Sequence, residues 1–598
     1  MSIRTLNEVF FTVADRTNDR VMLTRESGAW QPISSAQLKS WVYSAARQLQ
    51  AWGIGKGDRV VILSENRAEW AIADYAALLL GAVVVPIYAT QTADQIQYVL
   101  QNSEARIAFV STRQQYEKFT SIRERSSIEY VVIMDEAPEL TDALHIWSFL
   151  RAGMHDAGPD LDAIANAIEP EDLATIIYTS GTTGTPKGVM LTHGCIASNV
   201  SVSLDMFEVG KGDLSVSYLP LSHITARHVD YALQYRGITI AYCPYIDDLS
   251  RTLLEVKPTI IVAVPRVYEK VYNQVQHKMH GVKSALFTWA ISVGAANRET
   301  ILRGETPTSL PWKLANALVF SRIREGLGGR ARVFVSGGAP LGREIATWYA
   351  DIGIRIHEGY GLTETSPVIA VNNPVNHRLG SVGKPVSNVE IRIAPDGELL
   401  VRGPSVFQGY WRMPEETANA FEDGWFKTGD VASLDDDGYL SIIDRKKDLI
   451  KTSGGKFIAP QPIENSLKTN LLVGEAALLG DKRKFPAVLI VPNFAELEEW
   501  AQRHGVKFTS RKELVKSPHV QSLYEGIVEE LNRNLAQYEK LKKVLVIPAE
   551  LSIADGTLTP SMKLRRRHLE ERYRKEIDAL YAQAQAHSRA TASNRAIR

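Results

Sequence analysis

The sequence has little cysteine, no excess of charge of either sign and no long apolar run. Its two cysteines, Cys195 and Cys243, are far apart, which supports neither a disulfide framework nor a thiolate metal site. Lys and Arg number 68 together, as do Asp and Glu, so no net field holds the chain on nucleic acid or on an anionic bilayer. These shortages argue against nucleic acid as a partner and favour a reducing cytoplasm.

Segments that address or anchor a protein in a membrane are also lacking. Residues 1–20 carry acids and polar side chains where a signal peptide needs an apolar stretch, so we expect no export signal. Residues 75–89 are the most apolar stretch, but they are short for a bilayer span and include Gly81 and Pro86. A buried helix, a turn and a strand suit them better. We therefore expect a cytoplasmic protein, and the sequence leaves peripheral membrane contact and a homodimer open.

A length of 598 residues exceeds what one hydrophobic core usually serves, so two or more domains are expected. From about residue 35 to 265, helical patterns alternate with short apolar runs. Residues 68–80 read as a helix, whereas 82–87 and 259–264 read as strands. This alternation predicts an α/β fold with largely parallel sheets.

Three apolar runs end abruptly in small, polar or glycine-rich segments. LATIIY at 173–178 leads into TSGTTGTPKG, ARVFV at 331–335 into SGGAPLG, and IRIHE at 354–358 into GYGLTE. In open α/β sheets, ligand-binding loops lie at the carboxyl ends of strands. We therefore expect all three to be ligand-binding loops.

The pattern of expected secondary structure changes twice towards the C-terminus. From about Gly380, short strands and turns predict a β-rich subdomain, and after Asp444 a compact α+β unit begins. The unit contains a strand, KVLVIP at 543–548, and a helix near 517–540. One face of that helix carries Val520, Leu523, Ile527, Leu531 and Leu535. We predict an N-terminal domain at 1–444, a C-terminal domain at 445–580 and a polar, flexible tail at 581–598.

The segment YTSGTTGTPKG at 178–188 is the strongest chemical signal. Its backbone amides, threonine hydroxyls and Lys187 can wrap a phosphate. It departs from the Walker A spacing, because Pro186 precedes the lysine and Gly188 follows it, which disfavours P-loop hydrolases. A loop of this composition is more often a plain surface turn, but the whole eleven-residue string is far more specific.

The string resembles the adenylate-forming superfamily, which includes acyl-CoA synthetases, luciferases and adenylation domains of peptide synthetases. Further motifs of this family follow in the expected order over nearly the whole chain. They are YLPLSHITAR at 218–227, SGGAPL at 336–341, GYGLTETSP at 359–367, WFKTGD at 425–430, DRKKDLIKTSGGKFIAP at 444–460 and LTPSMKLRRR at 558–567. The motifs at 218–227 and 558–567 look most like those of long-chain fatty-acid members. The resemblance implies a large N-terminal domain of parallel-sheet α/β subdomains with a β-rich subdomain, and a small mobile α+β C-terminal domain.

The same resemblance implies roles for individual residues. For ATP and AMP binding they are Thr179, Ser180, Gly181, Thr182, Thr183, Gly184, Lys187, Gly338, Ala339, Pro340, Glu358, Gly359, Tyr360, Gly361, Thr363, Asp430 and Arg445. The implied catalytic residues are Lys187, His223, Glu364 and Lys563. The implied ligands of Mg²⁺ are Thr179 and Glu364, and the implied CoA-binding residues are Lys446, Gly454 and Gly455. The implied hinge residue is Lys447.

Several of these residues suit their roles on chemical grounds, although each has a plainer interpretation. Asp430 offers two acceptors for ribose hydroxyls, yet an Asp after Gly is more often a turn residue. Tyr360 between glycines can lie against a base, but such a tyrosine usually only packs. His223 alone would more often be a satisfied core histidine. Lys563 lies in a basic run that is normally solvated, and it follows Met562 where the family usually has glycine.

The sequence therefore predicts ATP-dependent activation of a long-chain fatty acid to acyl-AMP, with release of pyrophosphate and transfer to CoA. The expected partners are the fatty acid, ATP, CoA and Mg²⁺. Two alternatives stay open: a ligase that loads a carrier protein, and a CoA ligase for medium-chain or aromatic acids. A binder without activity is disfavoured, because the chain retains Lys187, Glu364, Asp430, Arg445 and Lys563.

Overall fold

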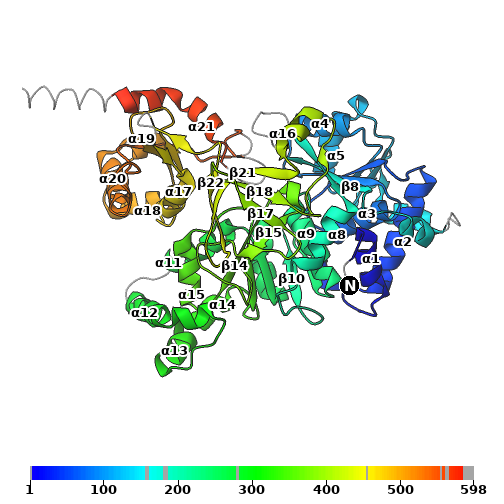
Figure 1. Ribbon diagram of the computed structural model, residues 1–598, viewed down its shortest axis with the longest axis horizontal. Coiled ribbons are helices and arrows are strands. Elements are labelled where there is room, and N and C mark those ends of the chain that lie inside the picture. The colour runs from blue at the N-terminus through cyan, green and yellow to red at the C-terminus, as the bar shows by residue number, and fades with distance from the viewer. Residues whose placement is uncertain are drawn as a thin grey trace, which may run out of the picture.

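The computed structural model describes residues 3–154, 160–179, 186–277, 282–452, 456–552, 555–558 and 564–582. Two long sheets form the body of the molecule, and a smaller sheet joins them to a C-terminal unit (Figure 1). The first sheet with its helices α2 (Ser35–Ala51) to α5 (Arg113–Thr120) and the C-terminal unit lie at opposite ends of the long axis. The α/β expectation is confirmed.

The first sheet has eight strands in the order β19-β9-β8-β4-β3-β5-β6-β7. The six strands β8, β4, β3, β5, β6 and β7 run parallel to one another. Strands β9 and β19 are antiparallel and lie at one edge. Their bounds are β3 Arg59–Leu63, β4 Val83–Ile87, β5 Ile107–Val110, β6 Tyr130–Ile133, β7 Leu144–His145, β8 Leu173–Thr179, β9 Lys187–Thr192 and β19 Gly409–Tyr410. Helix α3 (Ala68–Leu79) is buried along nearly its whole length, which confirms the buried helix and strand expected at 68–87.

The second sheet has nine strands in the order β16-β15-β14-β13-β12-β10-β11-β1-β2. The six strands from β14 to β1 are parallel, and antiparallel strands close both edges. Their bounds are β1 Met22–Glu26, β2 Ala29–Ile33, β10 Leu214–Ser217, β11 Thr239–Tyr242, β12 Ile260–Ala263, β13 Val333–Ser336, β14 Ile356–Gly361, β15 Val368–Val371 and β16 Lys384–Pro385. The expectation of largely parallel sheets is confirmed.

The loop expected after residue 358 is wrong in part. Strand β14 continues through Gly359 to Gly361, because β15 turns back and pairs with it antiparallel. A Cβ atom at Gly361 would lie 1.7 Å from the carbonyl oxygen of Pro367, so only glycine allows this approach. Pairing with an edge strand is a tertiary contact that the local pattern does not contain.

A five-stranded antiparallel sheet confirms the β-rich subdomain expected from about Gly380. Its strands are β17 Glu390–Ile393, β18 Glu398–Arg402, β20 Phe421–Glu422, β21 Trp425–Leu434 and β22 Leu440–Arg445. Leu399, Val401 and Leu440 form a small core with Ile369 of β15. The subdomain thus packs onto the end of the second sheet.

The C-terminal unit has its own core around a three-stranded sheet of β25 (Val473–Leu479), β26 (Ala487–Pro492) and β27 (Val544–Val546). Helices α17 (Pro460–Lys468), α18 (Phe494–Arg503) and α20 (Pro518–Asn532) cover this sheet. Strand β27 confirms the KVLVIP prediction. The predicted 517–540 helix is too long, because α20 ends at Asn532, whose side chain exchanges two hydrogen bonds with the backbone of Leu541.

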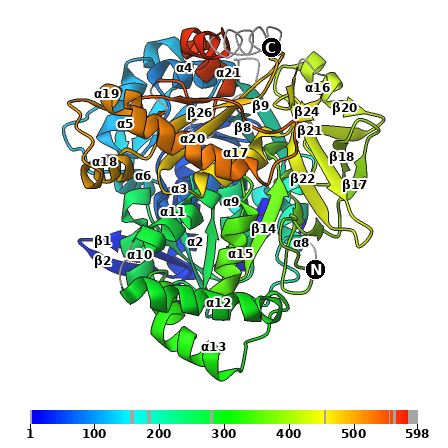
Figure 2. The same cartoon turned by 90° about the vertical axis from the view of Figure 1, so that its left-hand side faces the viewer.

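In the described residues between β12 and β13 there are five helical segments. They are α11 (Pro265–His277), α12 (Val282–Leu302), α13 (Leu310–Ala315), η3 (Asn316–Phe320) and α14 (Ser321–Glu325). Helices α12 and α13 project from the lower end of the molecule in two perpendicular views (Figures 1 and 2). Of the helices in the described part of the chain, none combines the length and the apolarity that crossing a bilayer requires.

A buried ion pair connects α3 to helix α9 (Ile224–Tyr235). Arg227 and Asp74 are each 1% exposed, and the guanidinium donates to both carboxylate oxygens. Arg227 also donates to the hydroxyls of Tyr231 and Thr175, each at 2.8 Å, and Tyr231 donates to Asp74. Every strong polar group in this cluster therefore has a partner, as burial of charge requires.

Replacement of Asp74 by Ala should destabilise the N-terminal domain by about 3–5 kcal/mol, because Arg227 would stay buried without its counter-ion. The measurement is the shift of the urea unfolding midpoint. The control is Asp205→Ala, which breaks an exposed pair with Arg236 and should cost no more than about 1 kcal/mol. Equal shifts for both variants would show that the buried pair contributes no more to stability than the exposed pair.

Candidate active site

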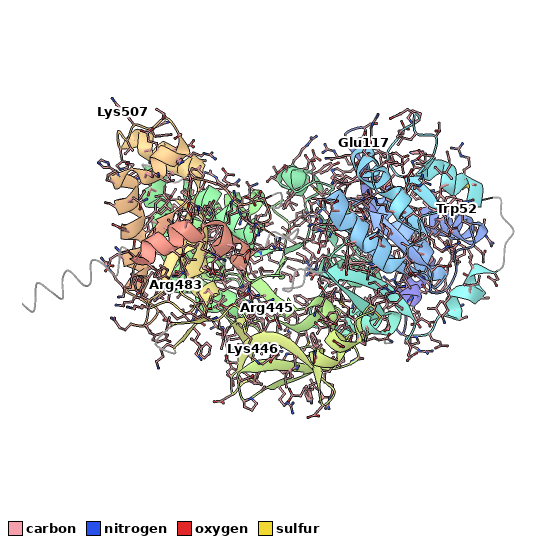
Figure 3. All side chains as sticks on the ribbon, turned by 90° about the horizontal axis from the view of Figure 1, so that it is seen from above. Trp52, Glu117, Arg445, Lys446, Arg483 and Lys507 are labelled. Carbon is pink, nitrogen blue, oxygen red and sulfur yellow. The ribbon has the colours of Figure 1, made fainter. Side chains whose placement is uncertain are left out.

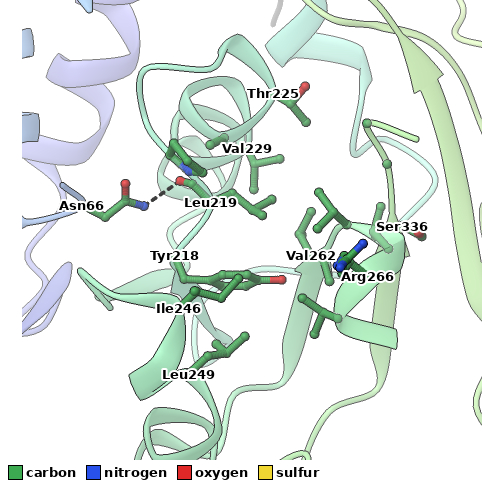
Figure 4. Close-up of a pocket in the computed structure, with 18 of the residues that line it drawn as sticks. Asn66, Tyr218, Leu219, Thr225, Val229, Ile246, Leu249, Val262, Arg266 and Ser336 are labelled. Atoms are coloured by element: carbon green, nitrogen blue, oxygen red, sulfur yellow. Dashed lines mark hydrogen bonds between the residues drawn. The ribbon is translucent and has the colours of Figure 1, made fainter. Parts of the chain in front are cut away.

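A cavity of about 1430 Å³ lies against the carboxyl ends of strands in the second sheet. Its wall is mainly apolar, with Leu219, Val229 and Val262 among the lining side chains (Figure 4). Asn66 closes one side by donating a 2.7 Å hydrogen bond to the carbonyl oxygen of Leu219. Such a space suits a large apolar ligand.

Two predicted loops meet at one end of this cavity. Strands β13 and β14 are parallel, with Ser336 opposite Glu358, so their following segments lie side by side. The glycines at this end include Gly338, whose φ of 82° favours a residue without a side chain. The lining residues of the two segments are Ser336, Gly337, Gly338, Gly359, Tyr360 and Gly361. Ala339 and Pro340 follow on the surface.

Glu358 is buried at the base of this corner. Burial raises its pKa to about 8, although a hydrogen bond from the Leu341 backbone acts in the opposite direction. The carboxyl group is therefore largely protonated at pH 7. In that state it can donate a hydrogen bond as well as accept one.

The Asp430 carboxylate is held by two motif residues. Strands β21 and β22 place Asp430 directly opposite Arg445, and the Arg445 Nε atom lies 2.7 Å from Asp430 Oδ1. Tyr360 donates its hydroxyl to Asp430 Oδ2 at 2.5 Å. Burial, together with the Asp430 charge, raises the pKa of Tyr360 well above its ordinary value, so this hydroxyl stays a donor. Figure 3 shows Arg445 between the two ends of the molecule.

Glu364 and Lys187 both contact Tyr410, a tyrosine that sequence reasoning missed. Tyr410 donates to Glu364 Oε1 at 3.0 Å, and the Lys187 ammonium lies 4.9 Å from the centre of its ring. Lys187 pairs with Thr179 across strands β9 and β8, and Thr363 is buried beside Glu364 in the short helix η4 (Thr363–Thr365). Tyr410 therefore contacts a carboxylate through its hydroxyl and an ammonium through its ring.

The sequence held only a weak sign of Tyr410. The residue lies between Gly409 and Trp411, much as Tyr360 lies between two glycines, but none of the motifs quoted above includes it. Its place depends on the pairing of β19 with β9, in which Tyr410 stands opposite Val189. That contact joins segments more than two hundred residues apart.

His223 caps the N-terminus of α9 and lines the cavity. Its Nδ1 accepts a 3.1 Å hydrogen bond from the backbone amide of Thr225. A neutral ring therefore carries its proton on Nε2. Arg227, one turn further on, is bound to Asp74, which fixes the start of α9. The role expected for His223 beside an acyl carboxylate stays a prediction.

Lys446 and Lys447 follow β22 at the start of the C-terminal unit, and neither lines the cavity. The Lys446 ammonium lies 2.6 Å from Asp396 and 2.7 Å from Glu398 of the β-rich subdomain. Burial and the neighbouring Arg445 lower the pKa of Lys447. The remaining site residues lie outside the described part of the chain, and their roles stay predictions: Ser180, Gly181, Thr182, Thr183, Gly184, Gly454, Gly455 and Lys563.

Comparison with solved structures supports the fold alone. The adenylation domain of a carboxylate reductase from Mycobacterium chelonae superposes with a TM-score of 0.76 at 24% identity, covering 97% of this chain and 91% of that chain. A fatty acyl CoA synthetase of Mycobacterium tuberculosis superposes with a TM-score of 0.61 at 23% identity, covering 95% and 98%.

Sequence relatives are closer. The chain is 38% identical over 565 residues to the long-chain-fatty-acid–CoA ligase FadD15 of Mycobacterium bovis, covering 93% of each protein. It is 32% identical over 616 residues to the human long-chain-fatty-acid–CoA ligase ACSBG2, covering 96% of this chain and 92% of the relative. A model of the AMP-binding enzyme family matches residues 10–411, and one of the AMP-binding enzyme C-terminal domain matches residues 447–585. The chain therefore belongs to the AMP-binding enzyme family.

Proposed function

We propose that the chain is an ATP-dependent, AMP-forming long-chain fatty-acid–CoA ligase. The observation that carries the proposal is an apolar cavity of about 1430 Å³. One end of this cavity is formed by Gly337, Gly338, Gly359 and Tyr360. Typical ligand pockets measure about 300–1,000 Å³, so this one has room for a long apolar chain beside a nucleotide. The chain matches relatives named long-chain-fatty-acid–CoA ligase over almost their full length, and this supports the same assignment.

In the first step, a carboxylate oxygen attacks the α-phosphorus of ATP and pyrophosphate leaves. Asp430 takes the ribose hydroxyls, Tyr360 faces the base, and His223 lies beside the acyl carboxylate. Lys187 and Lys563 place positive charge near the phosphoryl oxygens, where negative charge grows in the transition state. This arrangement needs no covalent bond to the enzyme.

Magnesium would be held by Glu364 and Thr179. The donor set fits, because carboxylate and hydroxyl oxygens are the hard ligands this cation prefers. Tyr410 hydrogen-bonds one oxygen of Glu364 and fixes the direction of the carboxylate. When bound, the ion neutralises charge on the ATP phosphates.

In the second step, the CoA thiol attacks the carbonyl carbon of the acyl-adenylate and AMP leaves. We assign residues 1–444 to an N-terminal domain and 445–580 to a C-terminal domain that rotates about Lys447 between the steps. Lys446 must then exchange Asp396 and Glu398 for CoA, and Gly454 and Gly455 let pantetheine approach the backbone.

The test is pyrophosphate release across a panel of carboxylic acids, with and without CoA. Acids of about twelve to eighteen carbons should outcompete acetate strongly, because each buried methylene contributes about 0.8 kcal/mol. Equal turnover of acetate and palmitate would overturn the long-chain assignment. Product formation with a carrier protein but not with free CoA would favour the alternative of a carrier-loading ligase.

Replacement of Asp430 by Ala should reduce kcat/KM for ATP at least about tenfold, because charge-assisted hydrogen bonds contribute about 1.5–3 kcal/mol each. Asp436→Ala, an identical change in the exposed turn of the same hairpin, serves as the control and should leave kcat/KM unchanged. If both folded variants had the same kcat/KM for ATP, Asp430 would be only a turn residue.

Replacement of Lys447 by Pro should let acyl-AMP form but block its conversion to acyl-CoA, because proline fixes φ at about −65° and hinders rotation. The measurement is a single turnover with labelled fatty acid, scoring both products. Lys447→Ala keeps the backbone free and should complete both steps. A Pro variant that makes acyl-CoA at the Ala variant's rate would show that the hinge lies elsewhere.

A further inference from the structure

The contact between the C-terminal unit and the rest of the chain has no apolar core of its own. Among the described residues, the hydrophobic clusters of the unit begin at Ile450, and those of the preceding sheets end at Ile442. An interface between domains without a shared apolar cluster opens easily, so relative motion of the two parts is the default expectation. The polar contacts of this interface therefore have a large share in setting the preferred orientation.

Helix α11 contributes side chains to three ion pairs that reach the C-terminal unit. The Arg266 Nη1 atom lies 3.2 Å from Glu475 Oε2 of β25. At the other end of α11, His277 Nδ1 lies 3.1 Å from Glu496 Oε2 and His277 Nε2 lies 3.9 Å from Glu499 Oε2, both on α18. Because Arg266 and His277 are eleven residues apart, about three helical turns, they lie on one face of α11. We call these two residues and the three glutamates the α11 strip.

The charges of the α11 strip are matched. Glu475 and Glu496 are only 14% and 19% exposed, so solvent screens them less than it screens a fully exposed carboxylate. Each ring nitrogen of His277 faces a separate carboxylate, and only a protonated imidazole can donate from both nitrogens. A metal centre would instead draw both carboxylates to one nitrogen. His277 also ends α11, where the partial negative charge of the helix C-terminus favours a cation.

The pairs of the strip can break without leaving a charge unpaired. Lys468 lies 3.3 Å from the second oxygen of Glu475, and Arg503 lies 3.8 Å from the second oxygen of Glu499. These cations belong to the C-terminal unit and move with it. The cost of an unpaired, partly buried carboxylate therefore does not prevent the contact from opening. Arg266 also lines the cavity on the side of Ser336, so the strip connects the cavity wall with the C-terminal unit (Figure 4).

We propose that the α11 strip holds the C-terminal unit in the observed orientation, with Arg266 and His277 as positioning residues. Rotation of the unit belongs to the proposed function, and the inference adds the side chains that set its balance. Loss of the strip should move the equilibrium away from the observed orientation. A weaker contact of the same interface, from Ser466 to Glu344 of α15 (Arg343–Asp351) at 3.4 Å, does not replace two ion-paired ends.

The first test measures orientation by pulsed electron paramagnetic resonance between two spin labels. Both native cysteines are buried, so the labels go on Glu117→Cys and Lys507→Cys, two exposed sites at opposite ends of the molecule (Figure 3). The double variant Glu496→Gln/Glu499→Gln should lower the ratio of the observed orientation to all others at least about threefold, because it removes two ion pairs of modest strength. Glu475→Gln should act in the same direction.

The matched control is Glu498→Gln/Glu550→Gln. It removes the same number of carboxylates from the C-terminal unit, but both of these pair with Arg511 of that unit. The control should keep the wild-type distance distribution. Arg266→Gln combined with Glu475→Gln should shift the distribution no further than either change alone, because both remove one contact. Unchanged distances in the first double variant, an equal change in the control, or additive effects at the Arg266 pair would overturn the strip.

The second test rests on the proposed function and uses single turnovers with labelled fatty acid. In Glu496→Gln/Glu499→Gln, the rate of acyl-AMP formation and the rate of acyl transfer to CoA should change by different factors, so that their ratio differs at least about threefold from the wild type. Neither glutamate lines the cavity, so lost ligand contacts do not produce this result. An unchanged ratio would overturn the role of the strip in turnover. A wild type that forms no acyl-AMP would instead contradict the proposed function, and the distance measurements would still decide the strip.

Discussion

The buried ion pair between Asp74 and Arg227 is the constraint on which the site depends. It fastens α9 to α3 and, through the Thr175 hydroxyl, to strand β8 of the other sheet. Helix α9 supplies one wall of the cavity and carries His223 at its N-cap. A charge pair in an apolar interior is costly unless its geometry is good, but it allows few alternative arrangements. We infer that it serves positional accuracy more than stability.

Around that fixed point, the site is assembled from strand ends. Parallel pairing aligns the SGGAPL and GYG segments at one cavity end, and antiparallel pairing in the β-rich subdomain sets Asp430 against Arg445. The Tyr360 hydroxyl donates to Asp430 and so connects β14 of the second sheet with β21 of the β-rich subdomain. The polar groups of the proposed nucleotide site are therefore held by backbone ladders, which move less than loops.

Helix α11 connects the cavity with the C-terminal unit. Val267, Val271 and Val275 line the cavity, whereas Arg266 lies 3.2 Å from Glu475 of β25. One helix thus contributes to the cavity wall and to a contact with the C-terminal unit.

By itself, the sequence determined the α/β class, the three-part order of the chain and the set of motif residues, because helix and strand periodicities and glycine-rich loops are local features. It also marked Asp430, Tyr360 and Glu364, although it did not indicate what holds them. Only the tertiary structure decided that β14 runs on through Gly361, that the 517–540 helix stops at Asn532, and that Tyr410 joins Glu364 and Lys187. The physical reason is the same in each case: the deciding contact comes from an edge strand, a returning loop or a distant segment. Arg227 shows this most clearly, since its motif gave no sign that its partner would be Asp74, 153 residues earlier in the chain.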